Sequence, residues 1–503
     1  MTKDKNETAG EDMSSSVTGD IMDMNEVIKL LDTTRSTFYR WLRSGKIKGM
    51  KIGRQWRFYR SEIERFLKGE EPRIELLANI HPLIESLIDR IRQFGADETP
   101  FQNEGKVEQA VDLMINLATK MGASDIHLAN IIKDNVEQSV ILRYRLDGVL
   151  HTIAEIDPKL LPAIIERWKF LSACDIHERK KSQEGSIHAS TSRKPLELRC
   201  CFLPTGLGES LTVRILDRAA SSLELDDLGF LWDDKEKILR WLQSPWGIIV
   251  VSGPTGSGKS TVLYVCLRIV TKPELKAITV EDPVEFLLPW TVQIQVQRDS
   301  GEKIIDALRA VMRSDPDVIM IGEIPDGETM SMAHNCALTG HLVLTTMHAN
   351  DAIGSLKNII DMSNNPYVVV ESTKLIISQR LVRKLCPECR ADSVLPPEML
   401  ELAKKLAING GLDWDILPKN FREPVGCTNC RGTGYKGRIA IVEILETTPE
   451  IVNAISNGVP LIDVQKLAVQ QGMTTMSADG IRKTGMGITS LSEVLRVAAG
   501  LLP

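Results

Sequence analysis

The chain has 503 residues, 43% of them hydrophobic and 25% charged, with a net charge of −6. This is an ordinary globular composition, and the length predicts three or four domains. No run of about 18 apolar residues occurs, so no membrane span is expected. The first 20 residues are polar and acidic, which argues against a secretory signal and predicts a disordered tail. The nine cysteines are too few and uneven for a disulfide scaffold, so a cytoplasmic protein is expected.

A basic patch indicates a separate module at residues 21–69. Eight basic residues and no acidic one lie from Arg40 to Arg60, although the whole chain is net negative. The apolar spacing predicts two helices, two short strands around Gly53-Arg54, and a third helix opened by a Ser61-x-x-Glu64 capping box with Leu67 facing inward. This order resembles the winged helix-turn-helix of the excisionase and MerR-like family. The resemblance makes 35–42 the recognition helix and 51–58 the wing.

The next two segments are a bridge and a mixed domain. Residues 70–105 carry an apolar helical stripe and then a polar linker from Gly95 to Gly105. Residues 106–220 predict a mixed α/β domain, with helices near 107–118 and 160–171, a strand at 126–128, and hairpins at 139–153 and 196–216.

The most informative stretch is Gly253-Pro254-Thr255-Gly256-Ser257-Gly258-Lys259-Ser260, followed by Thr261. It lies between an apolar run and a segment that can be a helix, and this order predicts a phosphate-binding P-loop. Glycines let successive backbone N–H groups converge on a phosphate at a helix N-terminus. Lys259 can then reach the β- and γ-phosphates, and the Ser260 hydroxyl can ligate Mg2+. The alternative is a chance glycine turn, and the flanking apolar runs argue against it.

Two apolar strands downstream end in carboxylates. One, from Ala277, ends at Glu281, and the other, from Asp317, ends at Glu323. An apolar run ending in an acid is the Walker B arrangement, in which Glu323 can orient or deprotonate the attacking water. A single such strand would be interpreted as a solvated strand end, but two after one P-loop favour a catalytic site.

A third strand, 342–347, lies between His341 and His348. A single histidine is usually structural. Two at the ends of one strand are predicted to sense the γ-phosphate or neighbouring carboxylates, although both could equally be satisfied core groups.

Four segments in this order resemble the type II secretion / type IV pilus assembly ATPases, a branch of the secretion motor superfamily. They are the P-loop, the acidic box 278–286, the segment 313–323 and the histidine box 339–351. The resemblance covers about 105–499. Further matching segments are 123–128, 143–148, 203–209, 379–386, 472–480 and 489–497.

The resemblance implies a multidomain α/β protein with a RecA-like P-loop ATPase core at 221–385. It implies a homo-hexameric ring at the cytoplasmic face of the inner membrane, attached peripherally through partners. ATP would lie between the upstream and core domains. Its hydrolysis would drive pilin or pseudopilin assembly through a membrane platform protein of the secretion machinery.

The resemblance also implies residue roles. Lys259 and Ser260 would bind phosphate and Mg2+, Glu323 would be the catalytic carboxylate, and Glu281 would be the acidic-box carboxylate. Further catalytic residues would be His341, His348, Arg199 and Arg214. The two arginines would neutralise charge on the transferred phosphoryl group, although they could also be surface charges on strands.

Two positions depart from the family pattern. The family usually has arginine where Pro325 stands, and also near Ser186. Pro325 removes a charge and a backbone donor just past the catalytic glutamate. This departure puts turnover or subunit coupling in doubt without affecting nucleotide binding.

Four cysteines form two C-x-x-C pairs in the predicted zinc element at 386–440, namely Cys386, Cys389, Cys427 and Cys430. Four thiolates suit tetrahedral Zn2+, which would fix a small subdomain with little core of its own. Redox or incidental pairs are the alternative. This element is typical of the assembly and secretion branch of the family. Residues 441–503 predict a C-terminal helical subdomain.

Three functions stay open: a secretion or pilus assembly motor, a DNA-binding regulator, and a diverged motor that hydrolyses ATP poorly. The aromatic residues within the basic patch fit DNA contact, but such modules also dock proteins. DNA or a docking protein at residues 21–69 are therefore both retained.

Overall fold

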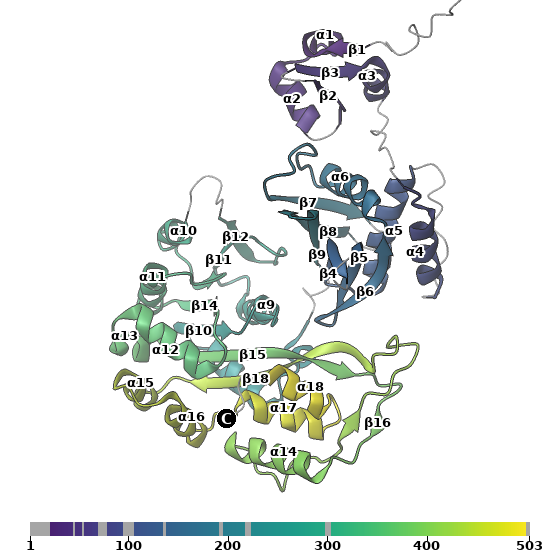
Figure 1. Ribbon diagram of the computed structural model, residues 1–503. Coiled ribbons are helices and arrows are strands. Elements are labelled where there is room, and N and C mark those ends of the chain that lie inside the picture. The colour runs from purple at the N-terminus through teal and green to yellow at the C-terminus, as the bar shows by residue number, and fades with distance from the viewer. Residues whose placement is uncertain are drawn as a thin grey trace, which may run out of the picture. The chain divides into compact units, whose positions relative to one another are not determined.

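The computed structural model describes residues 21–43, 46–52, 55–68, 78–93, 105–133, 137–190, 195–216, 223–296 and 303–498. The chain divides into two compact units, 1–217 and 218–503 (Figure 1). The predicted disordered tail, the wing turn at Gly53-Arg54 and the linker 95–104 lie outside the described residues. Among those described, no helix is long and apolar enough to cross a bilayer.

The first module packs three helices on a three-stranded sheet of order β1-β3-β2. Its elements are β1 (Ile21–Asp23), α1 (Met24–Leu30), α2 (Arg35–Arg43), β2 (Met50–Ile52), β3 (Gln55–Tyr59) and α3 (Arg60–Leu67). Its core includes Val27, Phe38 and Phe58, with the two phenylalanine rings 5.2 Å apart, edge to face. The predicted order of helices and wing strands is confirmed, and β1 is an additional strand.

The predicted capping box at Ser61 is wrong. The α3 helix begins at Arg60, and its N-cap, Tyr59, makes no side-chain cap bond. The capping box is at α1, where the Asp23 carboxylate accepts from the Glu26 amide and Glu26 accepts from the Asp23 amide at 2.7 Å. Leu67, which was predicted to face inward, is 59% exposed.

The second part of the smaller unit is a six-stranded antiparallel sheet of order β6-β5-β4-β9-β8-β7, covered on one face by helices (Figure 1). Its elements are α4 (His81–Gln93), α5 (Lys106–Lys120), β4 (Asp125–Lys133), β5 (Glu137–Leu146), β6 (Val149–Ile156), the 3-10 helix η1 (Pro158–Leu160), α6 (Leu161–Leu171), β7 (Gln183–Ser190), β8 (Pro195–Thr205) and β9 (Gly208–Leu216). The α4 helix packs on α5 through Leu83, Ile84, Leu87 and Ile91, so it shares the core of this α/β domain.

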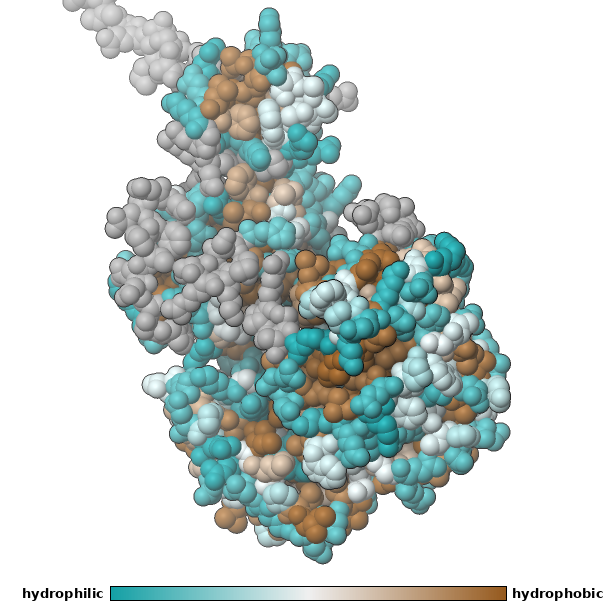
Figure 2. Space-filling model, turned by 180° about the vertical axis from the view of Figure 1, so that it is seen from behind, coloured by the Kyte–Doolittle hydropathy of each residue, from teal (hydrophilic) through white to brown (hydrophobic). Residues whose placement is uncertain are grey.

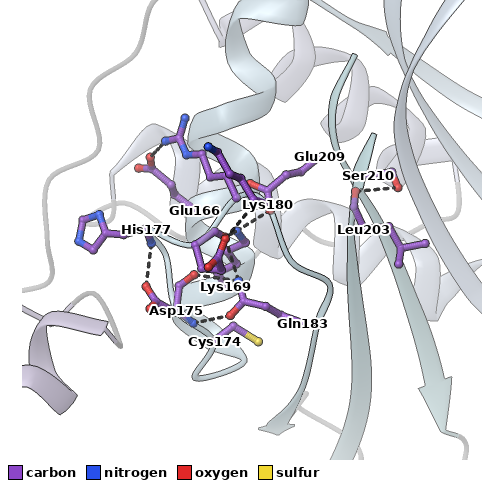
Figure 3. Close-up of polar contacts among 12 residues, drawn as sticks. Glu166, Lys169, Cys174, Asp175, His177, Lys180, Gln183, Leu203, Glu209 and Ser210 are labelled. Atoms are coloured by element: carbon purple, nitrogen blue, oxygen red, sulfur yellow. Dashed lines mark hydrogen bonds and ion pairs between the residues drawn. The ribbon is translucent and has the colours of Figure 1, made fainter. Parts of the chain in front are cut away.

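A buried lysine holds the segment between α6 and β7 (Figure 3). The Lys169 ammonium is fully buried, donates to the Glu178 carbonyl at 2.7 Å and lies 2.5 Å from the Glu209 carboxylate. The Gln183 amide donates to the Asp175 and Glu178 carbonyls at 2.9 and 3.1 Å. A buried ammonium requires a counter-charge. Glu209, the last residue of the 203–209 motif, therefore compensates the buried charge of Lys169.

The larger unit is built on a seven-stranded sheet of order β12-β11-β13-β14-β10-β15-β18, parallel except for the β15–β18 pair. Its strands are β10 (Gly247–Ser252), β11 (Ala277–Glu281), β12 (Thr291–Gln295), β13 (Val318–Ile321), β14 (Leu342–Met347), β15 (Thr373–Leu385) and β18 (Tyr435–Glu446), with a short ribbon of β16 (Ala391–Asp392) and β17 (Arg422–Glu423).

Helices cover both faces of this sheet. Along β10, Ile248 and Val250 join one apolar cluster, and Ile249 and Val251 join another. The first cluster includes side chains from helices α10 (Ile304–Val311), α11 (Gly327–Leu338), α12 (Ala352–Ser363), α13 (Pro366–Ser372), α15 (Pro449–Ser456) and α16 (Leu461–Gln470). The second cluster includes side chains from α7 (Leu225–Leu228), α8 (Trp232–Leu242) and α9 (Lys259–Val270). A parallel sheet with helices on both faces confirms the predicted RecA-like core.

The C-terminal part is less helical than predicted. It contains α14 (Pro397–Asn409), α17 (Met476–Gly485) and α18 (Leu491–Ala498), but also β18, which pairs with β15 from Leu375 to Leu385. In β18, residues 440–445 are all buried. A strand buried on both faces shows no alternation in sequence, so periodicity cannot distinguish it from a buried helix.

Large apolar side chains also reach the surface of the larger unit, where brown patches alternate with polar ones (Figure 2). Leu287 is 83% exposed and Trp290 69% exposed, and both follow the acidic box. The acidic box therefore precedes a loop whose apolar side chains are exposed.

Candidate nucleotide site in the larger unit

The predicted P-loop lies between β10 and α9. Gly253 has φ +150°, and a side chain there would lie 2.4 Å from the Gln379 carbonyl oxygen. Gly258 has φ +86° and is the N-cap of α9, which Lys259 begins. Glycine is required at both positions because of backbone conformation or close approach. The loop therefore has the geometry that the sequence predicted for binding phosphate at a helix N-terminus.

Lys259 lies within this loop. Its ammonium donates to the Gly253 and Pro254 carbonyls at 2.9 and 3.2 Å and lies 3.5 Å from His348 Nδ1. Partial burial lowers the pKa of Lys259, and the Glu323 carboxylate opposes this shift. Ser260, the predicted Mg2+ ligand, is exposed at the second position of α9.

Glu323 and His348 meet beside Lys259. His348 Nε2 lies 3.9 Å from Glu323 Oε2, and both side chains are partly exposed. Glu323 follows β13 and His348 follows β14, which are adjacent parallel strands. Because carboxyl ends of parallel strands share one edge of a sheet, Lys259, Glu323 and His348 converge at that edge. A carboxylate, an imidazole and a phosphate-binding lysine can together support phosphoryl transfer to water.

His341 does not join this group. It precedes β14, at the amino edge of the sheet, and its Nδ1 lies 2.8 Å from the Cys336 carbonyl and 3.1 Å from Thr339 Oγ1. It lines a cavity of about 640 Å³ with Gln243, Lys272 and Asp317 among others. Within one chain, the structure places His341 away from Lys259.

Glu281 is buried rather than open to the site. One carboxylate oxygen accepts from Thr279 Oγ1 at 2.6 Å and from the Gln293 amide at 3.1 Å, and the other accepts from the Tyr264 hydroxyl. The side chain is 3% exposed. Both carboxylate oxygens of Glu281 therefore accept hydrogen bonds inside the core. A carboxylate that activates water would instead face solvent.

Several supporting groups were missed from the sequence. The Gln379 amide, on β15, donates to the Ser257 carbonyl at 2.8 Å beneath the P-loop. Thr346 donates to the Gly322 carbonyl at 2.6 Å, which fixes the residue before Glu323. Both partners are distant in sequence, so no local motif indicates either contact.

The smaller unit contains the predicted arginines on the sheet face opposite its helices. Arg199 on β8 pairs in register with Arg214 on β9, and Arg214 with Asp125 on β4. The Arg214 guanidinium lies 3.1 Å from the Asp125 carboxylate and its side chain is 60% exposed. Ser186, near which the resemblance leads one to expect an arginine, pairs with Arg199 in the same row. The row thus contains two of the three basic groups that the family pattern leads one to expect.

The four predicted cysteines converge. Their sulfur atoms all lie within 4.8 Å of one another, with separations of 3.8 Å for Cys386–Cys427, 3.6 Å for Cys389–Cys430 and 3.7 Å for Cys427–Cys430. Four thiolates around Zn2+ at about 2.3 Å would lie about 3.8 Å apart. The backbone amides of Gly426, Cys427 and Gly434 also donate to these sulfurs. The cluster fits a tetrahedral metal ion.

Comparison with known proteins agrees with this geometry. The family model described as "Type II/IV secretion system protein" matches residues 101–496. The chain belongs to the type II/IV secretion system protein family. A "Helix-turn-helix domain" model matches residues 21–71 of this secretion-family chain.

Two curated relatives match most of this chain. The "Type IV pilus assembly ATPase TfpB" of Acinetobacter baylyi is 37% identical over 415 residues, covering 82% of this chain and 68% of that protein. The "Putative type II secretion system protein E" of Escherichia coli K12 is 38% identical over 398 residues, covering 79% and 78%. Among solved structures, the Legionella pneumophila ATPase DotB matches with TM-score 0.53 and 20% identity, covering 77% of this chain and 95% of that one. That similarity shows the fold alone.

The family assignment, together with the P-loop core, makes this chain an ATPase that uses nucleotide and Mg2+.

Proposed function

We propose that this secretion ATPase is a homo-hexameric motor that couples ATP hydrolysis to the assembly of a pilus or pseudopilus. The observation that carries the proposal is the convergence of Lys259, Glu323 and His348 at one sheet edge, in a chain of this family. The name of the Acinetobacter baylyi relative, a type IV pilus assembly ATPase, supports the assembly direction. The motor would work at the cytoplasmic face of the inner membrane, held there by platform and secretion proteins.

Roles for the site residues follow from their positions. Lys259 and the P-loop amides would hold the β- and γ-phosphates, and Ser260 would ligate Mg2+. Glu323 would orient and deprotonate the attacking water, and His348 would link that carboxylate to Lys259. Arg199 and Arg214 remain predicted γ-phosphate contacts, and Glu281 and His341 remain predicted site residues.

The test is Mg2+-dependent ATP turnover of the full chain over a range of protein concentrations, beside Glu323→Gln. Specific activity is expected to rise as the chain assembles, and the variant is expected to lose at least about 1,000-fold in turnover while still binding ATP. Activity that survives Glu323→Gln would contradict the assigned role. ATP binding without turnover, even in the assembled chain, would favour the diverged motor suggested by Pro325.

The four-cysteine cluster is proposed to bind one structural Zn2+. Its sulfur separations and the amide donors around it support this assignment. Metal analysis of the purified chain is expected to give one zinc per chain, and chelation is expected to lower the unfolding temperature. Cys201→Ser, outside the cluster, should retain the zinc, whereas Cys389→Ser should lose it. A zinc-free chain of unchanged stability would contradict the proposal.

A second candidate function is DNA binding by residues 21–68. The helix-turn-helix model match favours it, as do Arg40 and Arg43, which are exposed on α2. DNA affinity should fall steeply with salt and on replacing Arg40 and Arg43 with alanine. Lys29→Ala, on the exposed face of α1, is the matched control. DNA binding that is unchanged by salt and by the loss of these arginines would leave protein docking as the role of the module.

A further inference from the structure

The acidic box and the P-loop helix are connected by a buried tyrosine. Tyr264 lies on α9, five residues after Lys259, and is 3% exposed. Its hydroxyl donates to the Glu281 carboxylate and accepts from the Glu285 amide at 3.2 Å. Its ring packs on Phe286 with centroids 4.1 Å apart. One side chain of the phosphate-binding helix therefore contacts three residues of the segment 281–286.

This contact joins elements that the sheet order separates. The P-loop follows β10 and the acidic box begins within β11, and strands β13 and β14 lie between β10 and β11. Buried tyrosines generally find a hydrogen-bond partner, and most such bonds simply satisfy the hydroxyl. Here the hydrogen-bond partners of Tyr264 are on the segment 281–286, which continues from the strand beside Glu323. The amide of Gly322, the residue before Glu323, donates to the Val280 carbonyl of that strand at 2.8 Å.

The other hydrogen bonds of the Glu281 carboxylate come from its own strand, β11, and from the neighbouring strand β12. Thr279 is on the same strand, and Gln293 is on the adjacent β12. Gln293 also donates to the Phe286 carbonyl at 3.1 Å and accepts from the Leu288 amide at 2.7 Å, which fixes the loop after the box. Of the three side chains described above as donors to the Glu281 carboxylate, Tyr264 is the one on the P-loop helix.

We propose that Tyr264 is a positioning residue that fixes the acidic box relative to the helix carrying Lys259 and Ser260, acting through Glu281 and the Glu285 amide. Glu281 is then the anchor of this arrangement. Movement of α9 on binding phosphate is transmitted to 281–286, and so to the segment beside Glu323. This inference rests on the ATPase activity of the chain for its kinetic test but not for its structural one.

The kinetic test compares Tyr264→Phe with Thr279→Val in the full chain. Each variant removes one donor to the same buried carboxylate, but only the first breaks the connection to α9. Tyr264→Phe is expected to lower kcat about 10-fold with KM for ATP changed less than about 2-fold, because the P-loop is intact. Thr279→Val is expected to keep kcat within about 2-fold. Equal losses in the two variants would overturn the proposal.

The structural test measures amide hydrogen exchange of 281–288 with and without a non-hydrolysable ATP analogue and Mg2+. In the native chain the analogue should slow exchange across this segment. In Tyr264→Phe that protection should be lost and the Glu285 amide should exchange faster, while Thr279→Val should behave as the native chain. Unchanged protection in Tyr264→Phe would overturn the proposal. If the native chain bound the analogue but did not turn over ATP, lost protection would still support the positioning role, and only the motor proposal would fail.

A double-variant cycle gives a further check. If Tyr264 acts through Glu281, adding Glu281→Gln to Tyr264→Phe should cost little more in kcat than the more severe single change. Fully additive losses would contradict action through Glu281.

Discussion

The two edges of the core sheet differ sharply although both contain a histidine of the same motif. At the carboxyl edge, His348 lies between Lys259 and Glu323. At the amino edge, His341 contacts the Cys336 carbonyl in the last turn of α11. The residues are seven apart in sequence, yet the six-residue strand between them spans about 20 Å. In a parallel sheet, the edge at which a residue lies thus indicates which site it can join better than its separation in sequence does.

The largest effect should come from comparing these two histidines. His348→Gln is expected to lower ATP turnover about 100-fold, since it removes the imidazole between Lys259 and Glu323, the proposed catalytic carboxylate. His341→Gln should stay within about 3-fold at protein concentrations where the chain is monomeric. Turnover assays of both variants provide the measurement. A comparable loss from His341→Gln in the monomer would contradict the distinction between the edges.

A smaller effect is expected from Gln379, which supports the carboxyl edge from below. Gln379→Leu removes the donor to the Ser257 carbonyl, a hydrogen bond of about 1 kcal/mol, and should raise KM for ATP about 5- to 10-fold. Turnover at saturating ATP should change less. Gln471→Leu, at the end of α16, is the control and should leave KM unaltered. The role of Gln379 is excluded if both variants bind ATP as the native chain does.

Variants of Pro325 show how much ATP turnover at the carboxyl edge depends on a charge just outside that edge. Pro325 is exposed in the loop between β13 and α11, one residue before the N-cap Asp326. Pro325→Arg should raise turnover by about 3-fold, as expected for one exposed charge. Pro325→Ala separates the added charge from the removed ring. If alanine gives the same gain, the proline ring rather than the absent charge limits the rate.

Glu493 lies away from both edges, and its loss should leave turnover per folded chain unchanged. Its buried carboxylate accepts from Arg496 at 2.8 Å and from Arg383 at 2.8 Å. Burial raises the pKa of Glu493, but the hydrogen bonds and charges of these arginines outweigh it and lower the pKa to about 2. Because the folded pKa lies below the unfolded value, the stabilisation is complete above about pH 4.5 and is lost as pH falls toward 2.

Glu493→Gln should therefore lower the free energy of unfolding by about 3 kcal/mol at pH 7 and by less at pH 3.5. Urea unfolding at both pH values gives the comparison. Glu401→Gln, an exposed glutamate on α14, is the control. A deficit that is the same at both pH values would show that the ion pairs are not its source.

The placement of Lys259 and Glu323 at the carboxyl edge, and the clustering of the four cysteines, could be predicted because their signals are local. The P-loop, the Glu323 strand and the C-x-x-C pairs are short patterns with a required composition, and the structure brings their residues together as expected. The Tyr264 and Gln379 contacts could not be predicted, because they depend on which strands become neighbours. The β18 strand was missed because it is buried on both faces. The partial burial of Lys259 and the full burial of Glu281 likewise follow from packing rather than from sequence pattern.

One strand connects two of the features described above. The β15 strand contains Gln379 beneath the P-loop and ends at Leu385, directly before Cys386. Seven residues of extended chain measure about 23 Å. β15 pairs with β18 along this length, with a register shift between Arg383 and Leu385, so the two strands connect the P-loop to the cysteine cluster through one continuous ladder. A tilt of about 5° around Gln379 would move the cysteine cluster by about 2 Å, a displacement large enough to alter any surface that the cluster supports.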